Sequence, residues 1–154
     1  FFPVGGTPQV IHQEIATQGS AHGATPVLKP DVALTKTVDG MKITLDAGGM
    51  SLIPGNLIAL NYRLTDAVTG EPVLDLEPYL GAWGHTLILN ADQSEYLHSH
   101  PSKMLPVSGD RAGLRGGPEV EFKTIFPSRG PYRVWTQFQR GGKVTTVSFT
   151  LGVQ

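Results

Sequence analysis

The sequence predicts an all-β protein, an antiparallel β-sandwich with an immunoglobulin-like layout, about seven to nine strands and almost no helix. Two observations lead to this prediction. Short runs in which apolar and polar residues alternate dominate the chain, and no window shows a sustained helical period of apolar residues. The 19 glycines and 12 prolines also interrupt the 154 residues at short intervals, which is typical of short strands joined by turns.

The alternation places the strands along the chain. It is cleanest near the C-terminus, where Val120, Phe122 and Thr124 share one face of a strand. Glycine-bearing turns at 38–40 and 140–142 indicate hairpins, because glycine readily adopts the positive φ that such turns need. We expect strands at 31–38, 41–47, 56–66, 85–91, 95–100, 119–126, 132–139 and 143–151.

The chain divides into one β-sandwich domain, residues 31–154, and an extended N-terminal arm, residues 1–30. Within the arm, "TPQVIHQEIATQ" is suited to a strand and "GSAHGATP" to a flexible linker. That strand can lie along the edge of its own domain, or it can complete the sheet of a neighbouring subunit by donor-strand exchange. Exchange in a head-to-tail sense generates a ring or an open filament. We therefore expect self-association through residues 1–30.

Composition excludes several classes of protein. With 12 Lys and Arg against 13 Asp and Glu, and no basic stripe, the chain shows no sign of binding nucleic acid. The apolar runs are too short for a transmembrane segment. The absence of cysteine excludes disulfides, thiolate metal sites and a cysteine nucleophile. Because the first residue is Phe, we expect an exported protein whose leader has been removed, in an extracellular or periplasmic location.

Three of the five histidines fall in "GHTLILNADQSEYLHSHP", residues 84–101. His98 and His100 are two residues apart, so on a strand they project from the same face. If 85–91 and 95–100 pair as a hairpin, His85 comes opposite them and supplies a third nitrogen. Three imidazoles with an open position suit copper or zinc. We predict one copper ion bound by His85, His98 and His100, with zinc as the alternative.

Other side chains of the chain also carry atoms that can bind a metal. Met104, in the long loop 101–118, is a candidate additional ligand, and Met50 is a weaker one. His12 and His22 are isolated and are expected to be ordinary polar residues, and Asp92 is expected to form a turn. A purely structural role for the three clustered histidines also stays open.

Residues 75–154 resemble the YtkA-like group of secreted β-sandwich domains. The resemblance lies in Pro78 to Ala82, Gly84–His85, His98 to Pro101 and Phe126 to Tyr132. Domains of this group often accompany proteins that handle copper and other heavy metals in bacterial envelopes. The resemblance implies a metal role for His85, His98 and His100, and it does not extend to the arm.

Several functions fit these features. We expect an extracytoplasmic copper-binding protein, in one form the subunit of an extracellular filament, and in another a monomeric periplasmic copper chaperone or resistance protein. A three-histidine zinc or copper enzyme is the less favoured alternative, because no general base or nucleophile motif is found and no catalytic residue is assigned. A small-ligand or carbohydrate module would need a platform of exposed aromatic residues, and the aromatic residues here are scattered.

Overall fold

A computed structural model describes residues 13, 15, 18–19, 27–49, 51–107 and 113–154. Within these residues there are nine strands and no helix. The strands are β1 (Thr35–Val38), β2 (Met41–Asp46), β3 (Leu57–Asp66), β4 (Leu76–Glu77), β5 (His85–Asn90), β6 (Tyr96–Ser99), β7 (Glu119–Ile125), β8 (Gly130–Arg140) and β9 (Lys143–Val153).

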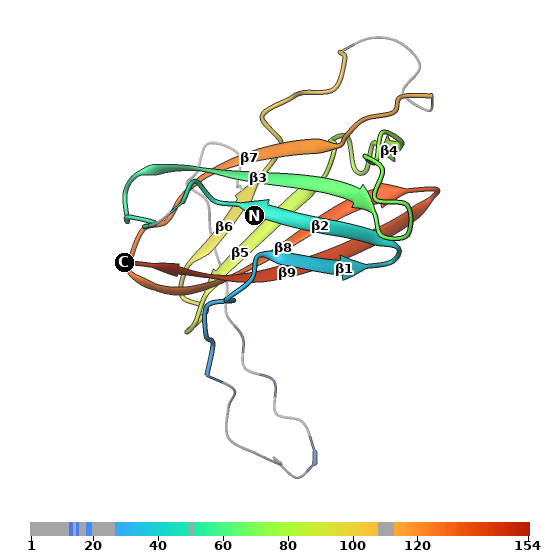
Figure 1. Cartoon of the computed structure of the whole chain (residues 1–154). Coiled ribbons are helices and arrows are strands. Elements are labelled where there is room, and N and C mark those ends of the chain that lie inside the picture. Colours follow the sequence, from blue (N-terminus) through green and yellow to red (C-terminus); the bar gives the residue numbers. More distant parts are fainter. Residues whose placement is uncertain (1–12, 14, 16–17, 20–26, 50, 108–112) are drawn as a thin grey trace.

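The strands form two antiparallel sheets that lie one over the other (Figure 1). The first sheet has the order β1-β2-β3-β7. In the second sheet, β9 pairs with β8 along its whole length, while β5 pairs with residues 132–137 of β8 and β4 with residues 139–140. The strands β4 and β5 therefore share the other edge of β8, and β6 lies beyond β5. The chain crosses between the sheets after β3, β6 and β7, which confirms the immunoglobulin-like β-sandwich.

The predicted strands recur with small shifts, except at 31–38, where the strand begins only at Thr35. The reason lies in the backbone partners of the preceding residues. The Asp31 amide donates to the Thr150 carbonyl in the second sheet, whereas the Leu34 carbonyl accepts from Leu45 in the first. Residues 31–34 thus pass from the edge of one sheet to the edge of the other.

The core fills the space between the sheets with side chains that alternate inward along the strands. Tyr62 packs edge-on against Phe122 and Phe138, with ring centroids 5.7 and 5.4 Å apart. Such contacts stabilise the core beyond the burial of apolar area alone. The largest side chains that are fully buried are Tyr62, Tyr132, Phe122, Phe126, Phe138 and Phe149.

The corner between β7 and β8 is fixed by Tyr132. Its hydroxyl accepts a hydrogen bond from the Ser128 amide at 3.1 Å, and it also contacts the side chain of Glu95. A tyrosine at the start of this strand, bonded to the backbone a few residues earlier, is the tyrosine corner of immunoglobulin-like domains. Glu95 lies at the end of the β5–β6 turn, so this corner also ties that hairpin to β8.

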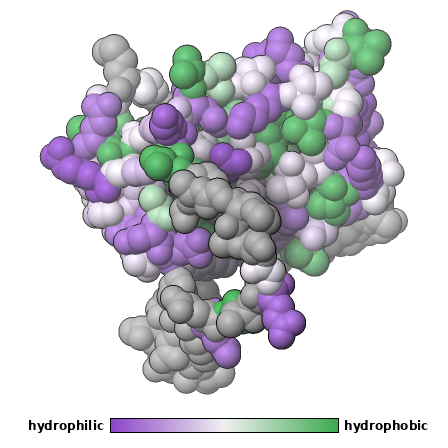
Figure 2. All heavy atoms as spheres, turned by 90° about the horizontal axis from the view of Figure 1, so that it is seen from below, coloured by the Kyte–Doolittle hydropathy of each residue, from purple (hydrophilic) through white to green (hydrophobic). Residues whose placement is uncertain are grey.

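One edge of the second sheet is covered by segments from elsewhere in the chain. Beside β9, Asp31 bonds to both backbone groups of Thr150, and the Lys36 ammonium donates to the Ser148 carbonyl at 2.8 Å. Near the C-terminus, Leu52 bridges to Val153. Elsewhere on the surface, exposed apolar side chains are scattered among polar ones, as the coloured part of Figure 2 shows for one face.

Candidate metal centre

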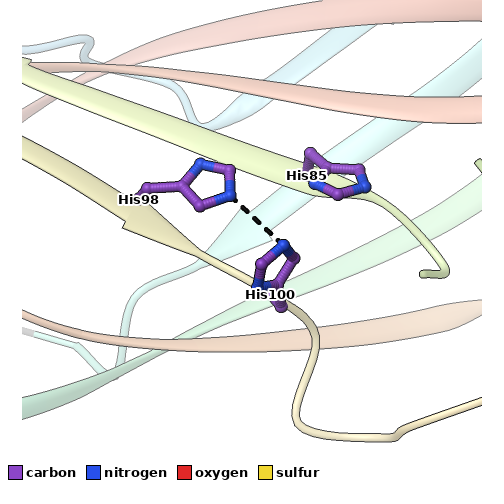
Figure 3. Close-up of side chains that lie close together, drawn as sticks. All are labelled: His85, His98 and His100. Carbon is purple, nitrogen blue, oxygen red and sulfur yellow. Dashed lines mark hydrogen bonds between the residues drawn. The ribbon is translucent and has the colours of Figure 1, made fainter. Parts of the chain in front are cut away.

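The β5–β6 hairpin brings the three histidines of the 84–101 stretch together. The register pairs Thr86 with Ser99, and both side chains point into the buried interior. Because side chains alternate along a strand, His85, His98 and His100 lie on the opposite, outward face of the sheet (Figure 3). The hairpin predicted from the sequence is therefore confirmed, and it places all three imidazoles side by side.

The turn that sets this register is held by side chains of its own residues. Asn90 accepts a hydrogen bond from the Glu95 amide at 3.0 Å, and Asp92 accepts one from the Ser94 amide at 3.0 Å. Hydrogen bonds to Ser94 lower the pKa of the Asp92 carboxyl. Asp92 is thus a turn former, as the sequence indicated.

The three rings lie close together, and one pair of their nitrogens has about the spacing of metal ligands. One ligand nitrogen from each ring lies within 4.8 Å of the others, and the Nε2 atoms of His98 and His100 are 3.2 Å apart (Figure 3). Two ligands of a tetrahedral ion, each bound at about 2.0–2.1 Å, stand about 3.3–3.4 Å apart. The 3.2 Å separation of the His98–His100 pair is close to this value.

His85 has one ring nitrogen committed to the backbone. Its Nε2 lies 3.0 Å from the Tyr79 carbonyl oxygen. A carbonyl can only accept, so Nε2 carries the hydrogen, and Nδ1 keeps the lone pair that can bind a metal. Histidine ligands of metals usually donate their second N–H to such a partner, which fixes the tautomer and the ring orientation.

The Tyr79 carbonyl is itself held in a tight turn. Tyr79 and Ala82 exchange two backbone hydrogen bonds, of 2.8 and 3.1 Å. The two central residues, Leu80 and Gly81, have φ values of 47° and 82°. Two positive φ values at the centre of a two-residue loop are typical of a type I′ turn. Glycine suits this geometry, whereas leucine rarely adopts it, and the Leu80 side chain is exposed.

The electrostatic environment keeps His98 neutral. Burial lowers the pKa of its imidazole, and the neighbouring His100 and His85 lower it further, while a hydrogen bond with the Thr86 backbone acts in the opposite direction. His98 is therefore uncharged at neutral pH, which is the form that binds a metal ion.

A pocket of about 210 Å³ opens beside the histidine cluster. Met104, predicted as an additional ligand, lies at this pocket, and its side chain is 79% exposed. The lining consists of Leu80, Gly81, Ala82, His100, Pro101, Lys103, Met104 and Leu105. The pocket is thus lined by one imidazole of the histidine cluster, His100, and by one thioether, Met104.

Other positions considered as ligands from the sequence are not described by the structure. Met50, His12 and His22 lie outside the described residues, as does most of the arm. Among the residues that the structure describes, no second group of three His, Asp or Glu side chains comes together as these histidines do. The sequence did not reveal the Tyr79 carbonyl as a partner of His85. The one sequence feature that pointed to this contact was Gly81, which permits the turn.

A larger groove, of about 580 Å³, lies on the outer face of the first sheet. It is lined by Thr44, Asp46, Asn61, Tyr62, Arg63, Ser102, Lys103, Glu119, Val120 and Glu121. Two of its charged side chains, Arg63 and Glu119, form an ion pair of 3.8 Å. None of the histidines lines it, so it is separate from the metal centre.

No helix long and apolar enough to cross a membrane occurs in the described part of the chain. None of the curated proteins compared with the chain matches it. Among solved structures, the chain is similar to the PKD domain from the human VPS10 domain-containing receptor SorCS2. The two share 9% sequence identity over 92% of this chain and 96% of that one, with a TM-score of 0.34.

Residues 36–154 match the model of a family described as a domain of unknown function, DUF8832. The match begins one residue after the start of β1 and runs to the last residue, so it takes in nearly the whole sandwich and all three clustered histidines. The chain belongs to the DUF8832 family.

Proposed function

We propose that this protein is an extracytoplasmic metal-binding β-sandwich protein that holds one copper ion with His85, His98 and His100. The observation that supports this most strongly is the convergence of three ligand nitrogens within 4.8 Å on the outer face of one hairpin. The hydrogen bond between His85 Nε2 and the Tyr79 carbonyl supports the proposal further. It fixes the tautomer and orientation of the ring, which an imidazole that binds a metal needs and a solvated imidazole does not.

Copper is favoured over zinc on chemical grounds. Nitrogen ligands bind divalent copper more tightly than divalent zinc. The resemblance to YtkA-like domains points in the same direction, and it also supports an extracellular or periplasmic location.

Binding is favoured over catalysis because the carboxylates closest to the histidines in sequence, Asp92 and Glu95, belong to the β5–β6 turn and are hydrogen-bonded there. Asp92 accepts hydrogen bonds from Ser94, and Glu95 bonds to the Tyr132 hydroxyl. Neither is free to act as the general base that a metal-bound water needs for hydrolysis. A chaperone, a resistance protein or a storage protein fits this arrangement better than a three-histidine enzyme.

The test is metal binding by the full chain and by a double variant, His98→Ala with His100→Ala. We expect one copper per chain for the unchanged protein, measured by titration calorimetry and elemental analysis. The double variant should lose binding, because one imidazole cannot hold the ion alone. Tyr96→Ala, at an exposed position of the same strand, is the matched control and should bind normally. Unchanged copper uptake by the double variant would place the site elsewhere.

Self-association through residues 1–30 is the second part of the proposal. Two apolar side chains of the arm that the structure describes, Ile15 and Val27, are about four-fifths exposed, at 80% and 79%. Most of the surface of both side chains is left uncovered, which favours burial against a neighbouring subunit over packing in cis. In a polymer joined by donor-strand exchange, each arm would complete the next subunit's sheet.

Deleting residues 1–26 tests this, because the deletion keeps Asp31 and its bonds to β9. The full chain should form polymers visible by electron microscopy, and the shortened chain should be a folded monomer that still binds copper. Equal assembly of the two chains would remove the arm from the mechanism.

A further inference from the structure

Met104 closely follows a stretch of backbone that is held against the first sheet just after the histidine cluster. After His100, Pro101 bridges to Phe122 on β7, and the Ser102 amide donates to the Glu121 carbonyl at 2.7 Å. The chain is therefore held against the first sheet up to Ser102. Met104 follows two residues later and lines the same 210 Å³ pocket as His100.

The exposure of Met104 needs an explanation. Methionine is an apolar residue that usually fills gaps in a core, and Met41 does so here at 1% exposure. Met104 is instead 79% exposed, so burial does not account for its place beside the histidines. A thioether at the surface remains available as a soft metal ligand.

The walls of the pocket suit a thioether better than a charged ligand. Leu80, Ala82 and Leu105 contribute apolar surface, and the lining contains no carboxylate. Leu80 reaches this wall from a left-handed backbone conformation, with φ of 47°. The turn between β1 and β2 has a similar pair of positive φ values, 49° and 75°, but uses Asp39 and Gly40, residues that tolerate them well. Leucine is therefore unfavourable for the conformation of this turn. Its apolar side chain, which lines the pocket, is what distinguishes the turn from the one between β1 and β2.

Resting on the proposed metal site, we propose that Met104 is its fourth ligand and that the completed set of three imidazoles and one thioether selects Cu(I). A thioether is a soft, neutral ligand that favours Cu(I), whereas zinc prefers imidazole, thiolate and carboxylate. Removing the sulfur therefore weakens Cu(I) binding and leaves Zn(II) binding nearly unchanged. Met104 is then the residue that sets the preferred metal and its oxidation state.

The test uses the full chain and Met104→Leu, which removes the sulfur but keeps an apolar side chain of similar size. Cu(I) affinity is measured without oxygen by competition with a chromophoric Cu(I) chelator, and Zn(II) affinity by titration. We expect Met104→Leu to bind Cu(I) about 10- to 100-fold more weakly and Zn(II) within about twofold of the unchanged chain. Val107→Ala, at a 96% exposed position three residues further along the same loop, is the matched control and should leave both affinities unchanged.

X-ray absorption of the Cu(I)-loaded protein gives a second, independent readout. The unchanged chain should show a sulfur neighbour at about 2.3 Å from copper, and Met104→Leu should show nitrogen neighbours alone. Equal Cu(I) affinity in the two proteins, or no sulfur neighbour in the unchanged chain, would overturn the role of Met104 and leave the three-histidine site standing. Failure of the unchanged chain to bind any of these ions would instead overturn the proposed function.

Discussion

The hydroxyl groups of Tyr62 and Thr136 lie 2.6 Å apart in the space between the two sheets. Tyr62 belongs to β3 and Thr136 to β8, and Thr136 also contacts the Thr86 hydroxyl at 3.0 Å. Burial raises the pKa of Tyr62, so its hydroxyl stays protonated. This buried chain of hydroxyls links the sheets and ends at the residue next to His85.

Replacing Tyr62 by Phe should lower the free energy of unfolding by about 1–2 kcal/mol. The aromatic packing is kept, and Thr136 keeps Thr86 as a partner, so the loss is that of one buried hydrogen bond. Urea unfolding measures it, and copper affinity should not change. A double-mutant cycle with Thr136→Val isolates the pair, and additive effects of the two substitutions would show that the hydroxyls do not interact.

Gly84 precedes His85 at a place where no side chain fits. A Cβ there would lie 2.7 Å from the Gln137 carbonyl oxygen and 3.1 Å from the Phe138 ring. Gly84→Ala should push β5 away from β8, lower the free energy of unfolding by about 1–3 kcal/mol and weaken copper binding by displacing His85. Gly113→Ala is the control, because nothing lies within 4 Å of the added Cβ. Equal stability and copper affinity of the two variants would contradict the prediction.

Copper affinity should fall as the pH drops through about 6, because imidazole must be neutral to bind the ion. At low pH the slope of log Kd against pH approaches the number of imidazoles that must lose a proton, about three for this site. For His85→Ala the limiting slope should be about two. Isothermal titrations between pH 5 and 8 measure it, and identical slopes for the two proteins would exclude His85 as a ligand.

The stability of the fold should also depend on pH through Asp66. Hydrogen bonds from the Thr69 and Val68 amides, followed by Arg140, lower the pKa of its carboxyl from 3.8 to about 2. A pKa depressed in the folded state means that this stabilisation is present above about pH 4 and is lost as the pH falls through about 2. Asp66→Asn should therefore unfold with a weaker pH dependence between 4 and 2. If Asp66→Asn and the unchanged chain showed the same pH dependence of unfolding, the predicted role of Asp66 would be wrong.

Much of the fold could be predicted from local patterns. The strict alternation in β7 and β8 fixes which side chains face the core, since a shift of one residue would expose all of them. The predicted strand at 31–38 was too long for a different reason. Residues 31–34 carry a strand-like pattern, but Asp31 and Leu34 bond to different sheets, and no local signal specifies that switch.

The site was predictable to the extent that it depends on strand geometry. The spacing of His98 and His100 and the short loop back to His85 were enough to bring the three rings together. The Tyr79 carbonyl was not predictable, because any residue has a carbonyl and only the turn at Leu80 and Gly81 aims this one at His85. The pocket beside His100 likewise depends on segments that are distant in sequence.

The segment that covers β9 also protects the protein from misassembly. An uncovered sheet edge presents a row of free backbone donors and acceptors, on which a strand from any other chain can grow into an aggregate. Here Asp31 occupies both backbone groups of Thr150, and the Lys36 ammonium places a positive charge at Ser148. Loss of the Asp31 or Lys36 side chain would therefore do more harm to solubility at high concentration than to stability in dilute solution.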